Sequence, residues 1–161
     1  MLFGIHHVAL STPDIARLIT FYTELLGFEV AYEGGWAAGW EASDRMLEAK
    51  GTACKMAMLR SGTAFLELFE FSSPPPRPAN PQRTAVDHGY THIGLNVRDI
   101  EAEYERLKNG GMYFAAPPAR LNEIIQAAYG RDPDGNIIEL LEISDPAWPF
   151  HFDQRELRQR V

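Results

Sequence analysis

Polar and hydrophobic positions in the first half of the chain follow the periods of strands and of one helix. Residues 5–11 and 28–32 have the short apolar or alternating runs that are typical of strands. Between residues 15 and 25, apolar side chains recur every three or four positions, which predicts a helix with one buried stripe. Two more strands are expected at 55–59 and 63–71, so this half is predicted to form a β-α-β-β-β unit.

The same order of elements starts again after a proline-rich stretch. Residues 72–81 hold five prolines and no periodic pattern, which is typical of a stiff linker. A strand, a helix and three further strands are expected at 91–96, 99–109, 112–115, 124–129 and 137–143. The residues at 131–136 form a turn before the last strand.

The two halves also correspond in sequence, which indicates an internal duplication. The segment HVAL that begins at His7 matches HIGL at His92, and residues 65–71 match 137–143 in the same order along the chain. We therefore predict an α+β fold of two tandem βαβββ modules that form a curved, cup-like mixed sheet with the helices outside. The predicted parts are a first module, a linker, a second module and a tail, at 1–71, 72–88, 89–145 and 146–161.

Two glutamates lie at matching positions of the repeat in otherwise apolar strand faces. Glu67 shares its strand face with phenylalanines and Glu139 shares its face with aliphatic residues, because side chains alternate along a strand. Burying a carboxylate without a partner costs several kcal/mol, so each one needs a cation or hydrogen bonds. Pairing of the repeats about a twofold axis would bring one histidine and one glutamate from each half together. Such a site suits Zn, Ni, Co, Mn or Fe, and its predicted ligands are His7, Glu67, His92 and Glu139.

A structural role for these residues is the alternative. A single histidine on a strand is more often hydrogen-bonded than metal-bound, and Glu67 and Glu139 would face solvent if the neighbouring leucines and isoleucines faced the core. Glu70 and Glu142 lie on the other face of the same strands, so these strands carry acids on both sides. The matched positions in the repeat favour the metal site over this alternative.

Length and composition restrict the remaining possibilities. With 161 residues, a net charge of −7 and a pI near 5.2, the chain suits one compact domain or two small modules, and its acidity argues against binding nucleic acid or an anionic membrane. Cys54 is the only cysteine, which rules out an internal disulfide and Cys-based zinc or iron–sulfur sites. The N-terminus lacks the basic region of a signal peptide and no run is long enough to span a membrane, so a cytoplasmic protein is expected.

A segment rich in tryptophan and glycine interrupts the first module and has no equivalent in the second. Its glycines at 34, 35 and 39 lack the spacing of a dinucleotide-binding loop. Two interpretations of Trp36, Trp40 and Met46 stay open: they form the floor of a substrate pocket, or they cover the end of a curved sheet.

Several of these motifs together resemble the vicinal oxygen chelate superfamily. The resemblance rests on the strands HVAL and HIGL, the strands ELFEF and ELLEI, and the turn DPDGN, and it spans roughly residues 5–143. The superfamily includes glyoxalase I, methylmalonyl-CoA epimerase, type I extradiol dioxygenases, and the fosfomycin and bleomycin resistance proteins. The resemblance implies that the two histidines and two glutamates fall on the four metal-ligand positions of glyoxalase I, where a ligand glutamate is the base. Here that base would be Glu67 or Glu139.

The resemblance implies three classes of function. The leading one is a glyoxalase-like lyase, isomerase or epimerase that binds a divalent metal and moves a proton next to the chelated carbonyl of a substrate with vicinal oxygens. An Fe(II) extradiol dioxygenase is the second, and it would leave Glu67 surplus. A non-catalytic binding or resistance protein without bound metal is the third. A homodimer is expected. The exact substrate, the metal and any requirement for a thiol or CoA stay open. Whether one chain or two chains build the site also stays open.

Overall fold

The structure, a computed structural model, describes residues 1–2, 4–80 and 83–152. The chain divides into two compact units, Met1–Pro81 and Gln82–Val161, and each is described by itself. The tail predicted at 146–161 lies partly outside the described residues. Of the helices in the described part of the chain, none combines the length and the apolar character needed to cross a membrane.

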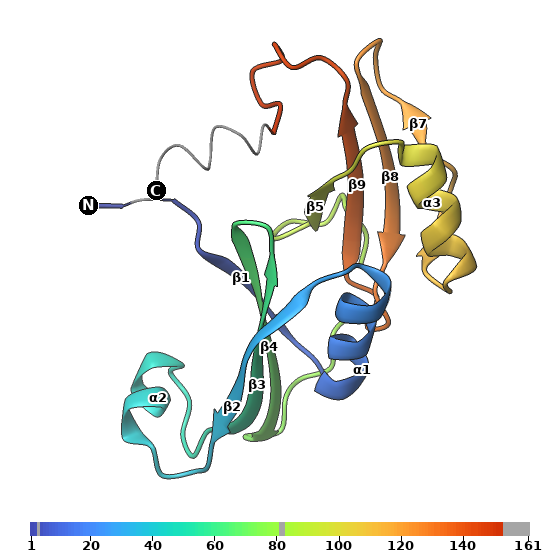
Figure 1. Cartoon of the computed structure of the whole chain (residues 1–161). Helices are drawn as coiled ribbons and strands as arrows, with labels where there is room; N and C mark the ends of the chain where they lie inside the picture. Colours follow the sequence, from blue (N-terminus) through green and yellow to red (C-terminus); the bar gives the residue numbers. More distant parts are fainter. Residues whose placement is uncertain (3, 81–82, 153–161) are drawn as a thin grey trace. The chain divides into compact units, whose positions relative to one another are not determined.

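The first unit is a four-stranded mixed sheet with one helix against it (Figure 1). Its elements are β1 (His7–Ser11), α1 (Ile15–Thr20), the π-helical turn η1 (Phe21–Leu25), β2 (Glu29–Trp36), α2 (Glu41–Met46), β3 (Ala53–Ser61) and β4 (Ala64–Ser73). The strand order is β1-β4-β3-β2. The β1 and β4 strands run parallel, whereas β3 is antiparallel to both of its neighbours.

The second unit repeats this plan with one additional short strand. Its elements are β5 (His92–Asn96), α3 (Ile100–Asn109), β6 (Tyr113–Phe114), β7 (Ala119–Arg120), β8 (Ile125–Arg131) and β9 (Ile137–Ile143). The order β5-β9-β8-β6 and the parallel pairing of β5 with β9 match the first sheet, and β7 pairs with β8. The α+β class and the two βαβββ units predicted from the sequence are confirmed.

The segment that interrupts the first module is more regular than its sequence suggested. The β2 strand continues through Gly35 to Trp36 because Gly35 has a φ of 149° and a Cβ there would lie 2.2 Å from the carbonyl oxygen of Cys54 on β3. The α2 helix, which was not predicted, is held by hydrogen bonds to the segment between it and β3. The Asp44 carboxylate accepts hydrogen bonds from the backbone N–H groups of Gly51 and Thr52 at 2.7 and 2.8 Å.

Each helix packs against the sheet face that carries the alternating leucines. In the first unit Leu66 and Leu68 of β4 are buried with Leu18 of α1, and in the second unit Leu140 of β9 is buried with Leu107 of α3. Because side chains alternate, the residues between these leucines point to the opposite face of each sheet. Glu67 and Glu139 lie on those opposite faces, the open faces of the two units.

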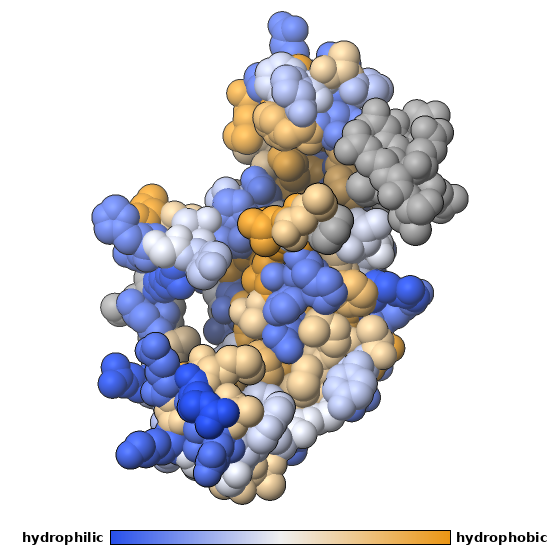
Figure 2. All heavy atoms as spheres, turned by 90° about the vertical axis from the view of Figure 1, so that its left-hand side faces the viewer, coloured by the Kyte–Doolittle hydropathy of each residue, from blue (hydrophilic) through white to orange (hydrophobic). Residues whose placement is uncertain are grey.

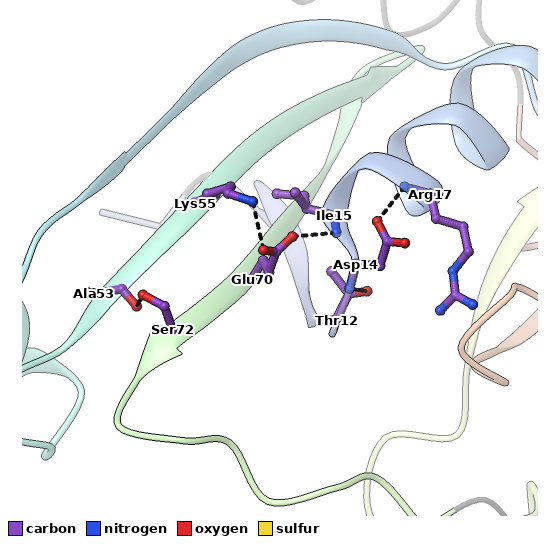
Figure 3. Close-up of polar contacts among 8 residues, drawn as sticks. All are labelled: Thr12, Asp14, Ile15, Arg17, Ala53, Lys55, Glu70 and Ser72. Atoms are coloured by element: carbon purple, nitrogen blue, oxygen red, sulfur yellow. Dashed lines mark hydrogen bonds and ion pairs between the residues drawn. The ribbon is translucent and has the colours of Figure 1, made fainter.

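The second acid of each strand fixes the helix. The Glu70 carboxylate accepts a hydrogen bond from the backbone N–H of Ile15 at 2.9 Å and pairs with the Lys55 ammonium at 2.8 Å (Figure 3). The Glu142 carboxylate accepts from the N–H groups of Asp99 and Ile100, at 2.7 and 3.1 Å. Both acids therefore bind the positive end of a helix, a structural role that explains why these strands carry carboxylates on both faces.

Several large hydrophobic side chains of the first unit remain at the surface. Val30, Tyr32, Trp40 and Met46 are all exposed, three of them with more than half of their surface accessible. Figure 2 shows hydrophobic surface between hydrophilic patches on one face of the molecule. Exposed apolar surface of this kind is typical of proteins that bind a ligand or a partner.

Candidate metal centre

Each unit places one histidine and one glutamate side by side on its open face. The first strand of each unit runs parallel to the last one, with Ala9 opposite Glu67 and Gly94 opposite Glu139. The histidine lies two residues before that alanine or glycine and therefore points to the same face. Local strand geometry and parallel pairing together bring each His–Glu pair into contact.

The contact has the same length in both units. The Nε2 atom of His7 lies 3.2 Å from Oε2 of Glu67, and Nε2 of His92 lies 3.2 Å from Oε2 of Glu139. Both glutamate side chains keep only 15% of their surface exposed, whereas the histidines keep 40% and 27%. Each pair is therefore a largely buried carboxylate with a more accessible imidazole at its edge.

The donor atoms have the separation of two ligands on one ion. Ligand atoms about 2.1 Å from an ion, at octahedral or tetrahedral angles, lie roughly 3.0 to 3.4 Å apart. The 3.2 Å between nitrogen and oxygen falls within this range in both units. The same distance also suits an imidazole–carboxylate ion pair, so the geometry is compatible with a ligand pair and with a metal-free pair.

Within each unit the structure brings together one of the predicted histidine ligands and one of the predicted glutamate ligands. Across residues 1–2, 4–80 and 83–152, no group of three or more His, Cys, Asp or Glu side chains is arranged to hold a metal ion. A single pair supplies two donors, which is half of a tetrahedral coordination shell. The full four-ligand site therefore stays a prediction, and each unit provides one half of it.

The second ring nitrogen of each histidine also has a partner. Nδ1 of His7 lies 2.9 Å from Nδ1 of His6, and Nδ1 of His92 lies 2.8 Å from Oγ1 of Thr91. The β1 strand begins at His7, two residues later than predicted, so His6 precedes it and strand alternation does not set the direction of its side chain. The His6 ring stacks on Phe65, with ring centres 5.0 Å apart.

Tyr129 is a further residue that the sequence did not single out. It lies opposite Glu139 in the pairing of β8 with β9, and its ring centre is 5.1 Å from that of His92. Burial, and to a lesser extent the charge of Glu139, raises the pKa of the Tyr129 phenol above its usual value. In the first unit Met58 lies opposite Glu67, so the two halves of the predicted site differ in polarity.

An aromatic cluster extends the open face of the first unit beyond Glu67. Phe69 and Phe71 follow Glu67 on the same face of β4 and stack with ring centres 5.4 Å apart. Trp36 contacts both rings edge-on and contacts Trp40 at 5.5 Å. These ring contacts are compatible with both interpretations of the tryptophans, as the floor of a substrate pocket and as a cover for the end of the sheet.

Comparisons with known proteins agree with this architecture. A family model described as Glyoxalase/Bleomycin resistance protein/Dioxygenase superfamily matches residues 4–140. A 2-epi-5-epi-valiolone epimerase from Actinomyces sp is 34% identical over 96% of this chain and 86% of its own. The metallothiol transferase FosB from Staphylococcus epidermidis is 28% identical over 87% and 84%. A glyoxalase family protein from Bacillus cereus superposes with a TM-score of 0.80 at 20% identity, over 90% of this chain and 97% of that one.

Proposed function

This chain belongs to the Glyoxalase/Bleomycin resistance protein/Dioxygenase superfamily, and on that premise we propose that it is a divalent-metal-dependent enzyme of the epimerase, isomerase or lyase type. The observation that carries the proposal is the repeated His–Glu pair, with the same 3.2 Å contact in each unit. The similarity to a 2-epi-5-epi-valiolone epimerase supports epimerisation as the specific reaction. The similarity to a metallothiol transferase supports a metal requirement.

In this proposal the two pairs jointly bind one ion of Zn, Ni, Co, Mn or Fe. Its ligands are His7, Glu67, His92 and Glu139. Equivalent geometry in the two pairs supports four ligands, and it speaks against a His-His-Glu dioxygenase triad in which Glu67 is surplus. The pairs would meet within one chain or across a homodimer, and the exposed apolar side chains of the first unit are compatible with a partner.

The residues of the pairs have separate tasks in the reaction. A divalent ion bound there would supply Lewis acidity toward a substrate with two adjacent oxygens, one of them a carbonyl. Glu67 or Glu139 takes the proton from the carbon next to that carbonyl and returns it to the other side. Both carboxylates suit this task by position, because each lies 3.2 Å from the Nε2 atom of the histidine that would share the ion.

Proton exchange at a defined carbon tests the proposal. The protein is stripped of metal, reloaded separately with each candidate ion and incubated with 2-epi-5-epi-valiolone in D₂O, while NMR follows deuterium uptake next to the carbonyl and the appearance of an epimer. We expect exchange that requires metal and disappears in Glu67→Gln or Glu139→Gln. Glu70→Gln is the matched control and should keep exchange, because Glu70 binds α1 and Lys55.

Two outcomes would redirect the assignment. Protein purified without a tag that holds no metal and takes up none on titration would favour a binding or resistance protein. Oxygen uptake with catechols in the Fe(II)-loaded protein, without proton exchange, would favour the dioxygenase. The assembly is tested separately by light scattering, where a single-chain mass would contradict the homodimer.

A further inference from the structure

The partners of the two outer ring nitrogens occupy the same position in the repeat. His6 directly precedes His7 and Thr91 directly precedes His92, and each lies just before the first residue of its strand. Their polar atoms approach the Nδ1 atoms of the following histidines to 2.9 and 2.8 Å. Two unlike residues thus make the same contact in both units, on the ring nitrogen that faces away from the glutamate.

These two partners share one chemical property. A threonine hydroxyl and a neutral imidazole can each donate or accept a hydrogen bond, whereas a backbone carbonyl only accepts and an ammonium only donates. The tautomer of a neutral histidine depends on what each ring nitrogen meets. A carboxylate 3.2 Å from Nε2 favours a proton on Nε2, and then Nδ1 needs a donor. Coordination through Nε2 requires its lone pair, and then the proton moves to Nδ1, which needs an acceptor.

We propose that His6 and Thr91 are positioning residues that serve His7 and His92 in both tautomers. They donate to Nδ1 when the histidine is paired with its glutamate, and they accept from Nδ1 when Nε2 binds the ion. His6 is held for this purpose by its stacking on Phe65. The inference rests on the proposed metal site, but its consequence for the histidine tautomer is a property of the chain itself.

The test uses variants that remove the hydrogen bond and keep the shape. Thr91→Val replaces the hydroxyl by a methyl group, and His6→Phe keeps the ring that stacks on Phe65. Thr91→Ser restores the hydroxyl and serves as the rescue. Matched controls are Thr63→Val and His88→Phe, since Thr63 and His88 are exposed and lie in a turn and in a loop outside the pairs.

Two readouts separate positioning from general destabilisation. Competition with a chromophoric chelator should show about 10-fold weaker Zn or Co binding for Thr91→Val and for His6→Phe, with wild-type affinity for Thr91→Ser and the controls. Nitrogen-15 NMR should show His92 in the Nδ1–H form in the Zn-loaded wild type, and in metal-free Thr91→Val the Nδ1 resonance of His92 should shift from its wild-type position. Melting temperatures of the metal-free variants should stay close to the wild-type value.

The outcomes distinguish this inference from the proposed function. If the wild type binds no metal at all, the four-ligand site is wrong. If the Nδ1 resonance of His92 is unchanged in metal-free Thr91→Val, the hydrogen bond from Thr91 does not set the tautomer and the inference is overturned. If the wild type binds metal and Thr91→Val and His6→Phe bind it equally well, the positioning role is refuted while the metal site stands. Failure of Thr91→Ser to restore affinity would likewise refute the hydrogen bond as the cause.

Discussion

The strand β9 carries two glutamates with different tasks, and substitution of each should affect a different property. Glu142 holds the first turn of α3 through two hydrogen bonds, at 2.7 and 3.1 Å, whereas Glu139 faces His92 on the other side of the sheet. We predict that Glu142→Ala lowers the free energy of unfolding and leaves metal affinity unchanged. Glu139→Ala should weaken metal binding and leave the free energy of unfolding almost unchanged.

The size of the first effect follows from the contacts. Loss of a side chain that caps a helix costs about 0.5 to 2 kcal/mol, and loss of a negative charge at the helix N-terminus costs about 0.3 to 1 kcal/mol. The N–H of Asp99 is exposed and can bind water instead, whereas the N–H of Ile100 is partly buried, which places the sum near 1 to 3 kcal/mol. A loss of 1 kcal/mol lowers the melting temperature of a protein of 161 residues by about 2 to 4 °C.

The size of the second effect follows from the ligand count. Removal of an outer partner of a metal ligand weakens binding about 10- to 100-fold, so loss of a ligand itself should weaken it by more than about 100-fold. The metal-free stability should change little, because only Nε2 of His92 loses its partner in Glu139→Ala and the His92 side chain keeps 27% of its surface accessible to water.

Both properties are measured on the same preparations. Urea unfolding of the metal-free protein gives the stability, and competition with a chromophoric chelator gives the affinity for Zn or Co. Glu105→Ala is the control, because Glu105 is an exposed acid on α3 outside the helix cap. The separate tasks of the two glutamates are refuted if Glu139→Ala destabilises the protein as much as Glu142→Ala does while metal binding stays the same. A loss below about 0.5 kcal/mol in Glu142→Ala would contradict the helix-capping role.

Three further predictions concern the first unit. The Lys55 ammonium, and after it the N–H of Ile15, lower the pKa of Glu70 below its ordinary 4.5, so the ionised carboxylate stabilises the fold above pH 4.5 and this stabilisation is lost as the pH falls through the lowered folded-state pKa. Urea unfolding between pH 5 and 3 should show this loss, and Glu70→Gln should make the free energy of unfolding less dependent on pH. Burial raises the pKa of the Cys54 thiol, so Ellman's reagent at pH 8 should react far more slowly with the folded than with the unfolded protein, and equal rates would contradict this. Gly35→Ala should lower the free energy of unfolding measured in urea by about 1 to 3 kcal/mol, because the φ of Gly35 is 149° and the new Cβ would lie 2.2 Å from the carbonyl oxygen of Cys54. Wild-type stability in this variant would refute the close approach of β2 to β3.

The sequence by itself determined the duplication and the residues of each strand that share a face. The match between His7 and His92, and between Glu67 and Glu139, is visible as a repeat, and period-two alternation separates Glu67 from Glu70. These features are local or repeated, so they need no knowledge of which strands pair. The helix α2 lacked such a signal because it depends on the contact of Asp44 with a backbone several residues ahead.

Only the tertiary structure decided which atoms meet on each face. The parallel register of β1 with β4 and of β5 with β9 sets the His–Glu contacts, and the register of β8 with β9 brings Tyr129 to Glu139. The contact between His6 and His7 could not be predicted from the sequence, because the first residue of β1 is set by pairing with another strand and not by its own pattern of polar and apolar residues. Periodicity is a property of neighbours along the chain, whereas register and strand ends depend on hydrogen bonds between segments far apart in sequence.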